Sequence, residues 1–238
     1  MSTLRLGANA RNEHPVDSRL TDDPPRDRAP MFTRDGQSIV FYSTRGGDWE
    51  AWTIRTDGSG LRRIAANPGG VVYSIPSPRD DSVLVNPAVD DAYFVRAWLN
   101  NPSKTPERLP YSGVGDAVVD GMDWSHDGSK IACIVISHGG HTAHVAVDDL
   151  STQRLTIVND DTAGGVRWLP DNRRLVYFGN NRSELVTFDT ITRQRTAVDV
   201  QLPGPSVNDV FAIARDGRTI YYGAVVHTDA DLWIAERK

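Results

Sequence analysis

The chain has 238 residues, of which 39% are hydrophobic, and a formal net charge of −5. This acidic balance argues against nucleic acid as a partner, because phosphate backbones attract basic surfaces, and a basic or neutral partner is easier to accommodate. No apolar stretch approaches the roughly 20 residues of a membrane span, and residues 1–30 carry no apolar signal-peptide core. The sequence therefore predicts a protein that is not inserted in a membrane. It would be cytoplasmic, or periplasmic or secreted if a signal peptide has been removed.

A similar segment recurs five times along the chain: a short strand, a tight turn, and a second strand rich in Ile, Val, Phe and Tyr. The turn positions are Asp35, Arg79, Asp127, Asp171 and Asp216, spaced by 44, 48, 44 and 45 residues. Asp–Gly and Asp–Asn turns suit tight hairpins because these residues tolerate positive φ. Four-stranded propeller blades repeat with about this period. The spacing therefore predicts an all-β propeller of four-stranded antiparallel blades.

The first repeat shows the expected blade most completely. Its first two strands fall within 30–41, and a Ser- and Gly-containing loop follows at 43–48. A third strand is expected over 50–54, a turn over 56–60 and a fourth strand over 61–64. Strands that are joined by short turns in this order pair as neighbours in an antiparallel sheet.

Residues 30–64 resemble the WD40-like (PD40) repeat of TolB and of the propellers beside tricorn-type and prolyl-oligopeptidase-type peptidases. The resemblance rests on a Pro and an aromatic before the Asp–Gly turn, then an apolar strand, an Asp-Gly-Ser turn and a final Leu-Arg-Arg-Ile strand. Residues 122–157 and 166–197 match the pattern moderately, and residues 76–109 match it poorly. The resemblance implies a propeller fold, and it specifies no chemistry.

The repeats predict a single propeller domain whose ring must be closed. Blades are expected near residues 22–64, 70–109, 116–157, 162–197 and 206–238. The last repeat ends before a fourth strand, so residues 18–21 are expected to supply that strand and thereby remove a sheet edge. This arrangement favours five blades. The alternative is six, with residues 1–20 as the remnant of a truncated blade.

Histidines mark one candidate site at the channel mouth, on the face that carries the loops between second and third strands. His138 and His141 fall in this loop of the third repeat, and His227 falls in the same loop of the fifth. Imidazoles are common metal ligands, so these loops could hold a divalent cation. No family metal motif is present, and solvated loop histidines are the alternative interpretation. No other cofactor is evident.

Carboxylates form a second candidate group in the segments between blades. We single out Asp120 and Asp209 as candidate ligand-binding residues that could hold Ca²⁺ or a basic peptide segment. The wider group consists of Asp22, Asp23, Asp116, Asp120, Asp160, Asp161 and Asp209. Ordinary turn formation is the alternative interpretation of these aspartates.

Aromatic side chains form the third group. Trp49, beside a glycine-rich loop, and Trp98 are candidates for stacking on a sugar or a peptide, with core or rim packing as the alternative. Trp124 and Trp168 occupy the first-strand position of their repeats, where packing between blades is expected. Cys133 lies in an apolar run and is expected to be a buried small hydrophobe.

The sequence contains no nucleophile elbow, P-loop, dinucleotide fingerprint or zinc-protease helix. We therefore favour a non-catalytic binding scaffold over an enzyme, with a protein or peptide recognised on the channel-mouth face. One alternative is a carbohydrate-binding or carbohydrate-active propeller, for which the partner would be a glycan. Another is the accessory propeller of a larger peptidase or kinase.

Overall fold

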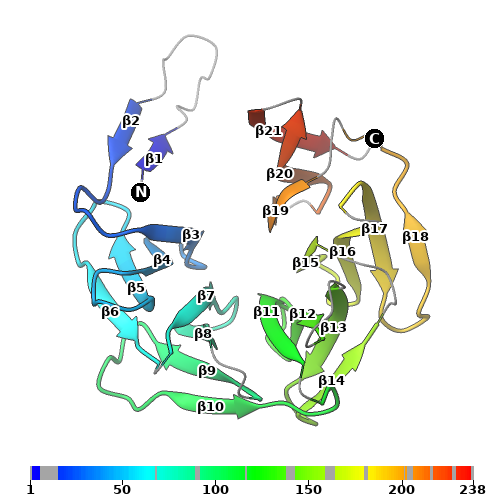
Figure 1. The fold of residues 1–238 in the computed structure, drawn as a ribbon, viewed down its shortest axis with the longest axis horizontal. Coiled ribbons are helices and arrows are strands. Elements are labelled where there is room, and N and C mark those ends of the chain that lie inside the picture. Colours follow the sequence, from blue (N-terminus) through cyan, green and yellow to red (C-terminus); the bar gives the residue numbers. More distant parts are fainter. Residues whose placement is uncertain are drawn as a thin grey trace.

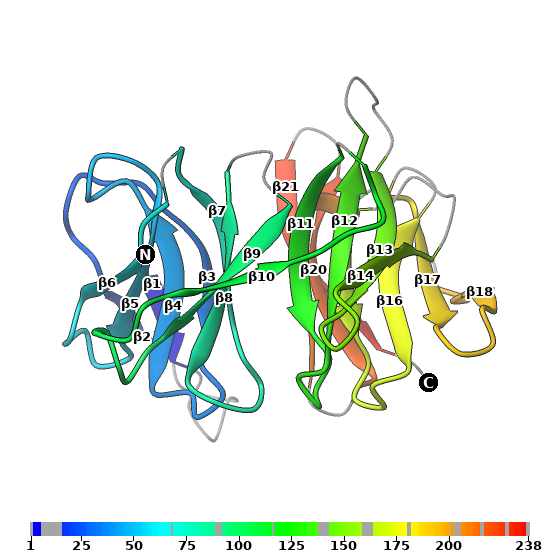
Figure 2. The same ribbon diagram turned by 90° about the horizontal axis from the view of Figure 1, so that it is seen from below.

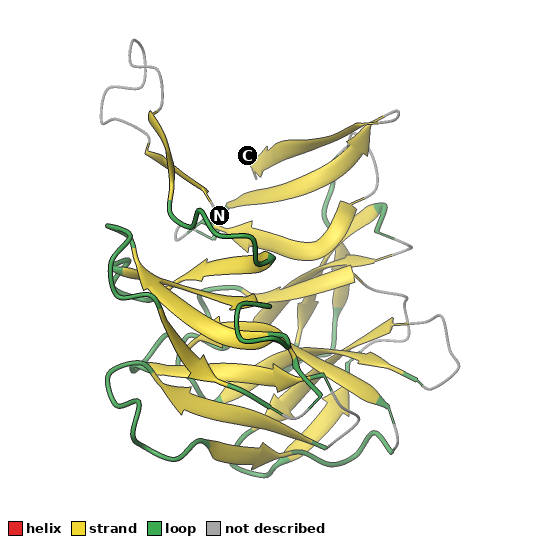
Figure 3. Cartoon of the chain, turned by 60° about the vertical axis from the view of Figure 1, so that its left-hand side comes forward, coloured by secondary structure: helices red, strands yellow, loops and turns green. Residues whose placement is uncertain are grey.

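The computed structural model describes residues 2–5, 16–67, 69–88, 92–115, 117–137, 143–158, 164–179, 182–200, 202, 206–214, 217–226 and 229–236. Within these ranges the chain forms strands joined by turns and loops, and no helix occurs (Figure 3). The strands make four sheets of four strands, one of three and one of two, and all of the strand pairs within these sheets are antiparallel.

The first five sheets along the ring, here called blades 1 to 5, follow the chain order. Blade 1 comprises β3 (Asp27–Phe32), β4 (Ser38–Ser43), β5 (Glu50–Arg55) and β6 (Arg62–Ala65). Blade 2 comprises β7 (Val71–Pro76), β8 (Ser82–Pro87), β9 (Tyr93–Trp98) and β10 (Glu107–Pro110). Blade 3 comprises β11 (Val118–Trp124), β12 (Lys130–Ile136), β13 (Ala143–Asp149) and β14 (Arg154–Ile157).

Two further blades follow these three in the chain, and a two-stranded sheet precedes them. Blade 4 comprises β15 (Gly164–Trp168), β16 (Arg174–Gly179), β17 (Glu184–Asp189) and β18 (Arg195–Ala197). Blade 5 comprises β19 (Ser206–Ile213), β20 (Thr219–Val226) and β21 (Asp229–Glu236). The two-stranded sheet pairs β1 (Ser2–Arg5) with β2 (Val16–Arg19).

The blades are arranged around a central axis, with the first strand of each blade innermost (Figure 1). Contacts join the innermost strands of consecutive blades, from β3 to β7, β11, β15 and β19. The hairpin turns between first and second strands lie together along the lower edge of Figure 2. We call this end of the molecule the turn face, and the opposite end, with the β4–β5 loop and the connections between blades, the loop face. The expected all-β propeller architecture is confirmed.

In blades 2, 3 and 4 the second strand forms the core because a neighbouring blade lies on each side of it (Figure 1). In β8, β12 and β16 five consecutive residues are buried, which explains why β12 and β16 read as continuous apolar runs. Trp124 is only 4% exposed and donates its Nε1–H to the carbonyl of Ile75 in blade 2, at 3.2 Å. Trp168 is 1% exposed. The expected packing of these two tryptophans is confirmed.

A buried cation joins the inner strands of three blades. Arg167 of β15 donates to the carbonyls of Met122 at 2.8 Å, Val166 at 2.8 Å and Phe211 at 3.0 Å. Burial lowers the pKa of Arg167, and the charge of Asp123 opposes this shift. Burial in turn raises the pKa of Asp123, which accepts the backbone N–H of Trp168 at 2.8 Å. Because these carbonyls belong to β11, β15 and β19, one guanidinium satisfies backbone acceptors in blades 3, 4 and 5.

Hydrogen bonds also link the hairpin turns of successive blades on the turn face. Arg34 donates to the carbonyl of Arg79 at 3.5 Å, and Arg79 donates to the carbonyl of Asp127 at 3.2 Å. The backbone N–H of Asp127 donates to Oδ1 of Asn172 at 2.9 Å. These contacts repeat at equivalent turns, so neighbouring blades are held in register by polar contacts as well as by their apolar cores.

The pairing expected of residues 18–21 with the last blade is not confirmed. Within the described ranges, β2 pairs with β1, and β21 pairs with β20 alone. The residues that follow β2 contact blade 1: Leu20 packs against its buried cluster, and the Thr21 hydroxyl donates to Asp27 at 2.8 Å. These contacts hold the segment on the blade 1 side of the opening seen in Figure 1.

Two further expectations concern burial. Cys133 is fully buried, as expected, and burial raises the pKa of its thiol well above the usual range. Among the described residues there is no helix with the length and apolar character needed to cross a bilayer.

Candidate functional site

Three innermost strands place a polar or aromatic residue at the same level near the loop face. Arg28 of β3 pairs with Tyr42, Tyr73 of β7 pairs with Asn86, and Asp120 of β11 pairs with Ile134. Each partner lies three positions beyond the first paired residue of its second strand. A β-bulge interrupts the pairing of first and second strands in each of these blades. Bulges re-aim side chains at strand ends, here at the mouth of the channel.

An aromatic cluster with one cation lies at the boundary of blades 1 and 2 on this face. The ring centroids of Tyr42 and Trp49 are 5.0 Å apart, and those of Tyr42 and Tyr73 are 6.0 Å apart. The Arg28 guanidinium lies over the Trp49 ring, 5.0 Å from its centroid. Arg28 is exposed, and the three aromatic residues are half-buried. These residues, Arg28, Tyr42, Trp49 and Tyr73, are called the loop-face cluster below.

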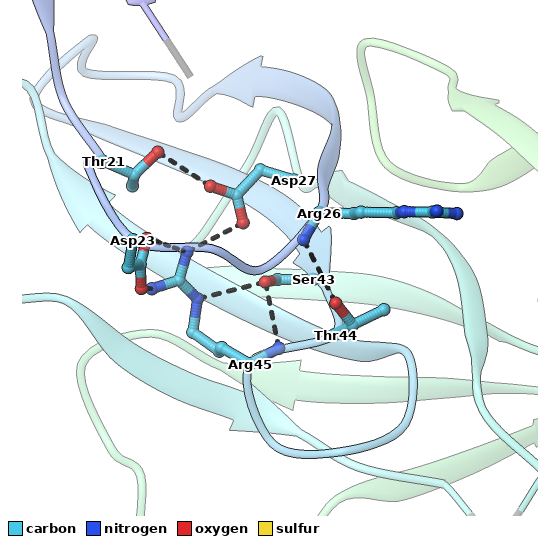
Figure 4. A network of polar contacts seen from close by, with 7 residues as sticks. All are labelled: Thr21, Asp23, Arg26, Asp27, Ser43, Thr44 and Arg45. Carbon is cyan, nitrogen blue, oxygen red and sulfur yellow. Dashed lines mark hydrogen bonds and ion pairs between the residues drawn. The ribbon is translucent and has the colours of Figure 1, made fainter.

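The loop that carries Trp49 is held at its base by a network of polar contacts, drawn in Figure 4. Arg45 forms ion pairs with Asp23 at 2.6 Å and with Asp27 at 2.7 Å, and it donates to Ser43 at 3.1 Å. Its guanidinium also lies 5.3 Å from the centroid of the Trp52 ring. Nearly buried charges that are paired in this way fix the geometry of a loop.

The electrostatics of this network favour the ionised form of Asp27. Burial of Asp27 tends to raise its pKa, but hydrogen bonds from Arg45, Ser43 and Thr21 outweigh burial and lower the pKa below its usual value. Asp23 was expected in an acidic cluster, but its carboxylate is neutralised by Arg45. Asp23 therefore stabilises the loop that presents Trp49 and is not presented to a ligand as an unpaired charge.

The structure does not bring the second candidate tryptophan to the same site. Trp98 is the last residue of β9 and pairs with Ser82, next to the hairpin turn of blade 2, so it lies at the turn face. Lys104 covers its ring, with Nζ 3.3 Å from the centroid. Trp98 and Trp49 therefore lie at opposite ends of the blades.

Several candidates fall outside the described residues, and nothing is stated of their geometry. His138, His141 and His227 belong to this group, as do Asp116, Asp160 and Asp161. The backbone of Asp209 lies in β19, but its side chain is not described. In the part of the chain that the structure does describe, no three His, Cys, Asp or Glu side chains are grouped as metal ligands.

Sequence reasoning missed three members of the loop-face cluster. Arg28, Tyr42 and Tyr73 are separated along the chain and belong to strands that the repeat pattern treats as structural. The signal that could have found Arg28 and Tyr73 is their position on the first strand of a repeat, and Tyr42 is the partner of Arg28 on the second strand.

Comparisons with known proteins address the fold. No protein-family model matches the chain. An uncharacterized protein of Agrobacterium fabrum is 30% identical over 126 residues, which is 50% of this chain and 43% of that protein, so the chain spans less than half of this relative's length. A solved TolB of Acinetobacter baumannii superposes with a TM-score of 0.62 at 12% identity, over 87% of this chain and 49% of that one.

This chain covers a larger share of two further solved structures. A candidate TolB of Agrobacterium tumefaciens superposes with a TM-score of 0.66 at 12% identity, over 93% of this chain and 80% of that one. The chain has a TolB-like propeller fold. An oligogalacturonate lyase in complex with manganese has a TM-score of 0.68 at 15% identity, over 99% of this chain and 70% of that one. The TolB-like fold is thus shared with proteins of different activities, so activity must be argued from the site.

Proposed function

We propose that this TolB-like propeller is a non-catalytic binding scaffold that recognises a protein or peptide through its loop face. The observation that carries the proposal is the loop-face cluster, in which an exposed arginine lies over Trp49 beside two half-buried tyrosines. Trp, Tyr and Arg are the residue types that contribute most at protein interfaces. The aromatic rings would hold an apolar anchor of the partner, and Arg28 would donate hydrogen bonds to its carbonyl or carboxylate oxygens.

Pre-organisation supports this role. The nearly buried Arg45–Asp27 ion pair fixes the base of the β4–β5 loop, so Trp49 needs little ordering when a partner binds. The proposal includes a ring of five blades. In this ring the N-terminal segment covers the free side of blade 1 through Leu20. The proposal leaves a divalent cation at His138, His141 and His227 as a separate prediction, to be tested by calorimetric titration with Mn²⁺ and Ca²⁺.

Affinity capture with two matched tryptophan variants tests the proposal. Trp49→Ala removes the centre of the loop-face cluster, and Trp98→Ala removes a half-buried tryptophan at the opposite end of the blades. We expect wild type and Trp98→Ala to retain the same stoichiometric partner from a lysate of the source organism, and Trp49→Ala to lose it. Thermal melts confirm that both variants fold.

The same variants also distinguish a protein-binding scaffold from the carbohydrate-binding alternative. Retention of the partner by Trp49→Ala, or failure of wild type to retain any partner over a range of salt concentrations, would contradict the proposal. A glycan array on which wild type binds and Trp49→Ala does not, in the absence of a protein partner, would favour a carbohydrate-binding propeller instead.

A further inference from the structure

A second polar site lies on the turn face, away from the loop-face cluster. A groove of about 600 Å³ separates the hairpin turns of blades 1 and 2, a volume in the range of small-molecule sites. Blade 1 lines it with the β3–β4 turn and the end of β5, and blade 2 lines it with the β7–β8 turn and the segment after β9. None of the candidates expected from the sequence lines this groove.

The groove collects four arginines, of which Arg34 is attracted by Asp35 and Arg55 by Asp57 without direct ion-pair contact. Arg34, Arg55, Arg62 and Arg79 all line it. Within the described residues, none of them forms an ion pair with a carboxylate. Three of them donate single hydrogen bonds to backbone carbonyls of Arg79, Leu99 and Asp127. Since a guanidinium carries five N–H donors, most of this donor capacity is unused.

The carboxylates that line the same groove are already engaged. Asp35 accepts the Thr33 hydroxyl at 2.6 Å and the Gln37 N–H at 3.0 Å. Asp80 accepts the Ser82 hydroxyl at 2.6 Å and forms an ion pair with Arg96 at 2.6 Å. Burial tends to raise the pKa of Asp80, but the hydrogen bonds from Ser82 outweigh it, and the pKa falls to about 2. Asp81, the third carboxylate in the lining, accepts the N–H of Asn100 at 3.0 Å. These acids serve the turns, and their charge offsets that of the four arginines only in part, since Asp35 attracts Arg34 without direct ion-pair contact.

Two buried polar atoms in the lining also lack partners. Thr53, 5% exposed, has a buried Oγ1 with no hydrogen-bond partner, and Nη1 of Arg62 is likewise buried without one among the described residues. Buried polar groups without partners are rare in folded proteins and call for an explanation. A ligand that draws the Arg62 side chain toward the groove would give its guanidinium an acceptor.

We propose that this groove binds a small polyvalent anion through Arg34, Arg55, Arg62 and Arg79, with carboxylate or phosphate oxygens as the recognised group. Guanidinium forks match both kinds of oxyanion in a bidentate manner. Clustered unpaired cations in a concave site raise the local concentration of anions. The site is independent of the proposed partner-binding function, because it lies at the other end of the blades.

Isothermal titration calorimetry at low ionic strength tests the inference with citrate and with tripolyphosphate as probes. We expect wild type to bind at least one probe, and Arg55→Gln/Arg62→Gln to weaken that binding at least about tenfold. Arg154→Gln/Arg193→Gln, which removes two exposed arginines from blades 3 and 4, is the charge-matched control and should bind as wild type does. Trp49→Ala should also bind unchanged, which separates this site from the loop face.

The two probes identify the source of the oxyanion. Citrate binding alone indicates a carboxylate ligand, tripolyphosphate binding alone indicates a phosphate ligand, and binding of both supports the shared chemistry. The probe should also raise the melting temperature of wild type and not that of the folded double variant. Absence of binding by wild type, or equal affinity in wild type and the double variant, would overturn the inference.

Discussion

The side-chain amide of Asn86 satisfies both backbone groups of Gly121 in the neighbouring blade. Its Oδ1 accepts the Gly121 N–H at 2.8 Å, and its Nδ2 donates to the Gly121 carbonyl at 3.0 Å. Asn86 is fully buried in β8, and Gly121 lies beside the bulge of β11. A Cβ at position 121 would approach Cδ2 of Leu84 to 2.8 Å and Oδ1 of Asn86 to 3.1 Å, so a larger residue here would displace these side chains.

The first prediction follows from this pair. Asn86→Ala leaves a buried N–H and a buried C=O of Gly121 without partners, and we expect it to lower the free energy of unfolding by about 2–4 kcal/mol. Asn101→Ala, in an exposed turn, is the control and should change it by about 0.5 kcal/mol or less. Urea titration measures both variants. Equal midpoints for Asn86→Ala and wild type would show that the contact between blades contributes nothing.

The second prediction concerns Asp148, a fully buried residue of β13. Both of its carboxylate oxygens lack hydrogen-bond partners among the described residues, and burial, followed by the charge of Asp149, raises its pKa to about 6. The folded state therefore binds the proton more tightly than the unfolded state, so stability falls as pH rises from 3.8 to about 6. Above this window the cost of the buried charge is constant.

Asp148→Asn should remove that cost. We expect the variant to exceed wild type in unfolding free energy by about 1–3 kcal/mol at neutral pH, and the advantage to shrink below about pH 4. Chemical denaturation across this pH range measures the difference. An advantage that is the same at every pH would show that the carboxyl group does not titrate differently in the folded protein.

The third prediction concerns Asp27, for which the dependence of stability on pH is opposite to that of Asp148. The pKa of Asp27 is lowered in the folded state, so its contribution to stability is present above its usual pKa and is lost as pH falls through the folded value. Asp27→Asn should therefore destabilise the protein at neutral pH, with a difference that diminishes in acid. Thermal melts at a series of pH values follow this change, and a loss of stability that grows as pH falls would exclude the ion pair with Arg45 as its cause.

The fourth prediction concerns the N-terminal segment. Deletion of residues 1–22 removes Leu20 from the cluster of Ile39, Phe41 and Ile54, and it removes the Thr21 bond to Asp27. Exposing that apolar face should lower the melting temperature and promote aggregation. Deletion of residues 1–10 spares these contacts and should have a much smaller effect. If the longer deletion melts with the intact chain, the segment does not stabilise blade 1.

The sequence predicted the blades because their signals are local. Asp35–Gly36 and Asp127–Gly128 mark hairpins, and the glycines have φ of 68° and 69°. Trp124 was predicted to pack between blades because the repeat places it on the innermost strand. The expected closure of the ring by residues 18–21 is not confirmed, and the contacts of Leu20 and Thr21 with blade 1 arise from tertiary packing that no periodicity records.

The site was predicted less well for a geometric reason. Trp49 follows a loop and lies at the loop face, as expected, whereas Trp98 lies at the far end of its strand because β9 runs away from that face. Tyr73 meets Tyr42 only because blades 1 and 2 pack side by side. Contacts between blades depend on bulges and register, which the repeat pattern does not encode.

The central claim is that the loop face receives the partner, and site-specific photo-crosslinking tests it most directly. A photoreactive phenylalanine replaces Asp48 in the β4–β5 loop at the loop face or Gln37 at the turn face, both exposed residues of blade 1. We expect a discrete protein adduct from position 48 in the source lysate, absent when Trp49→Ala is added, and none from position 37. Adducts of equal yield from both positions, or from position 37 alone, would contradict it.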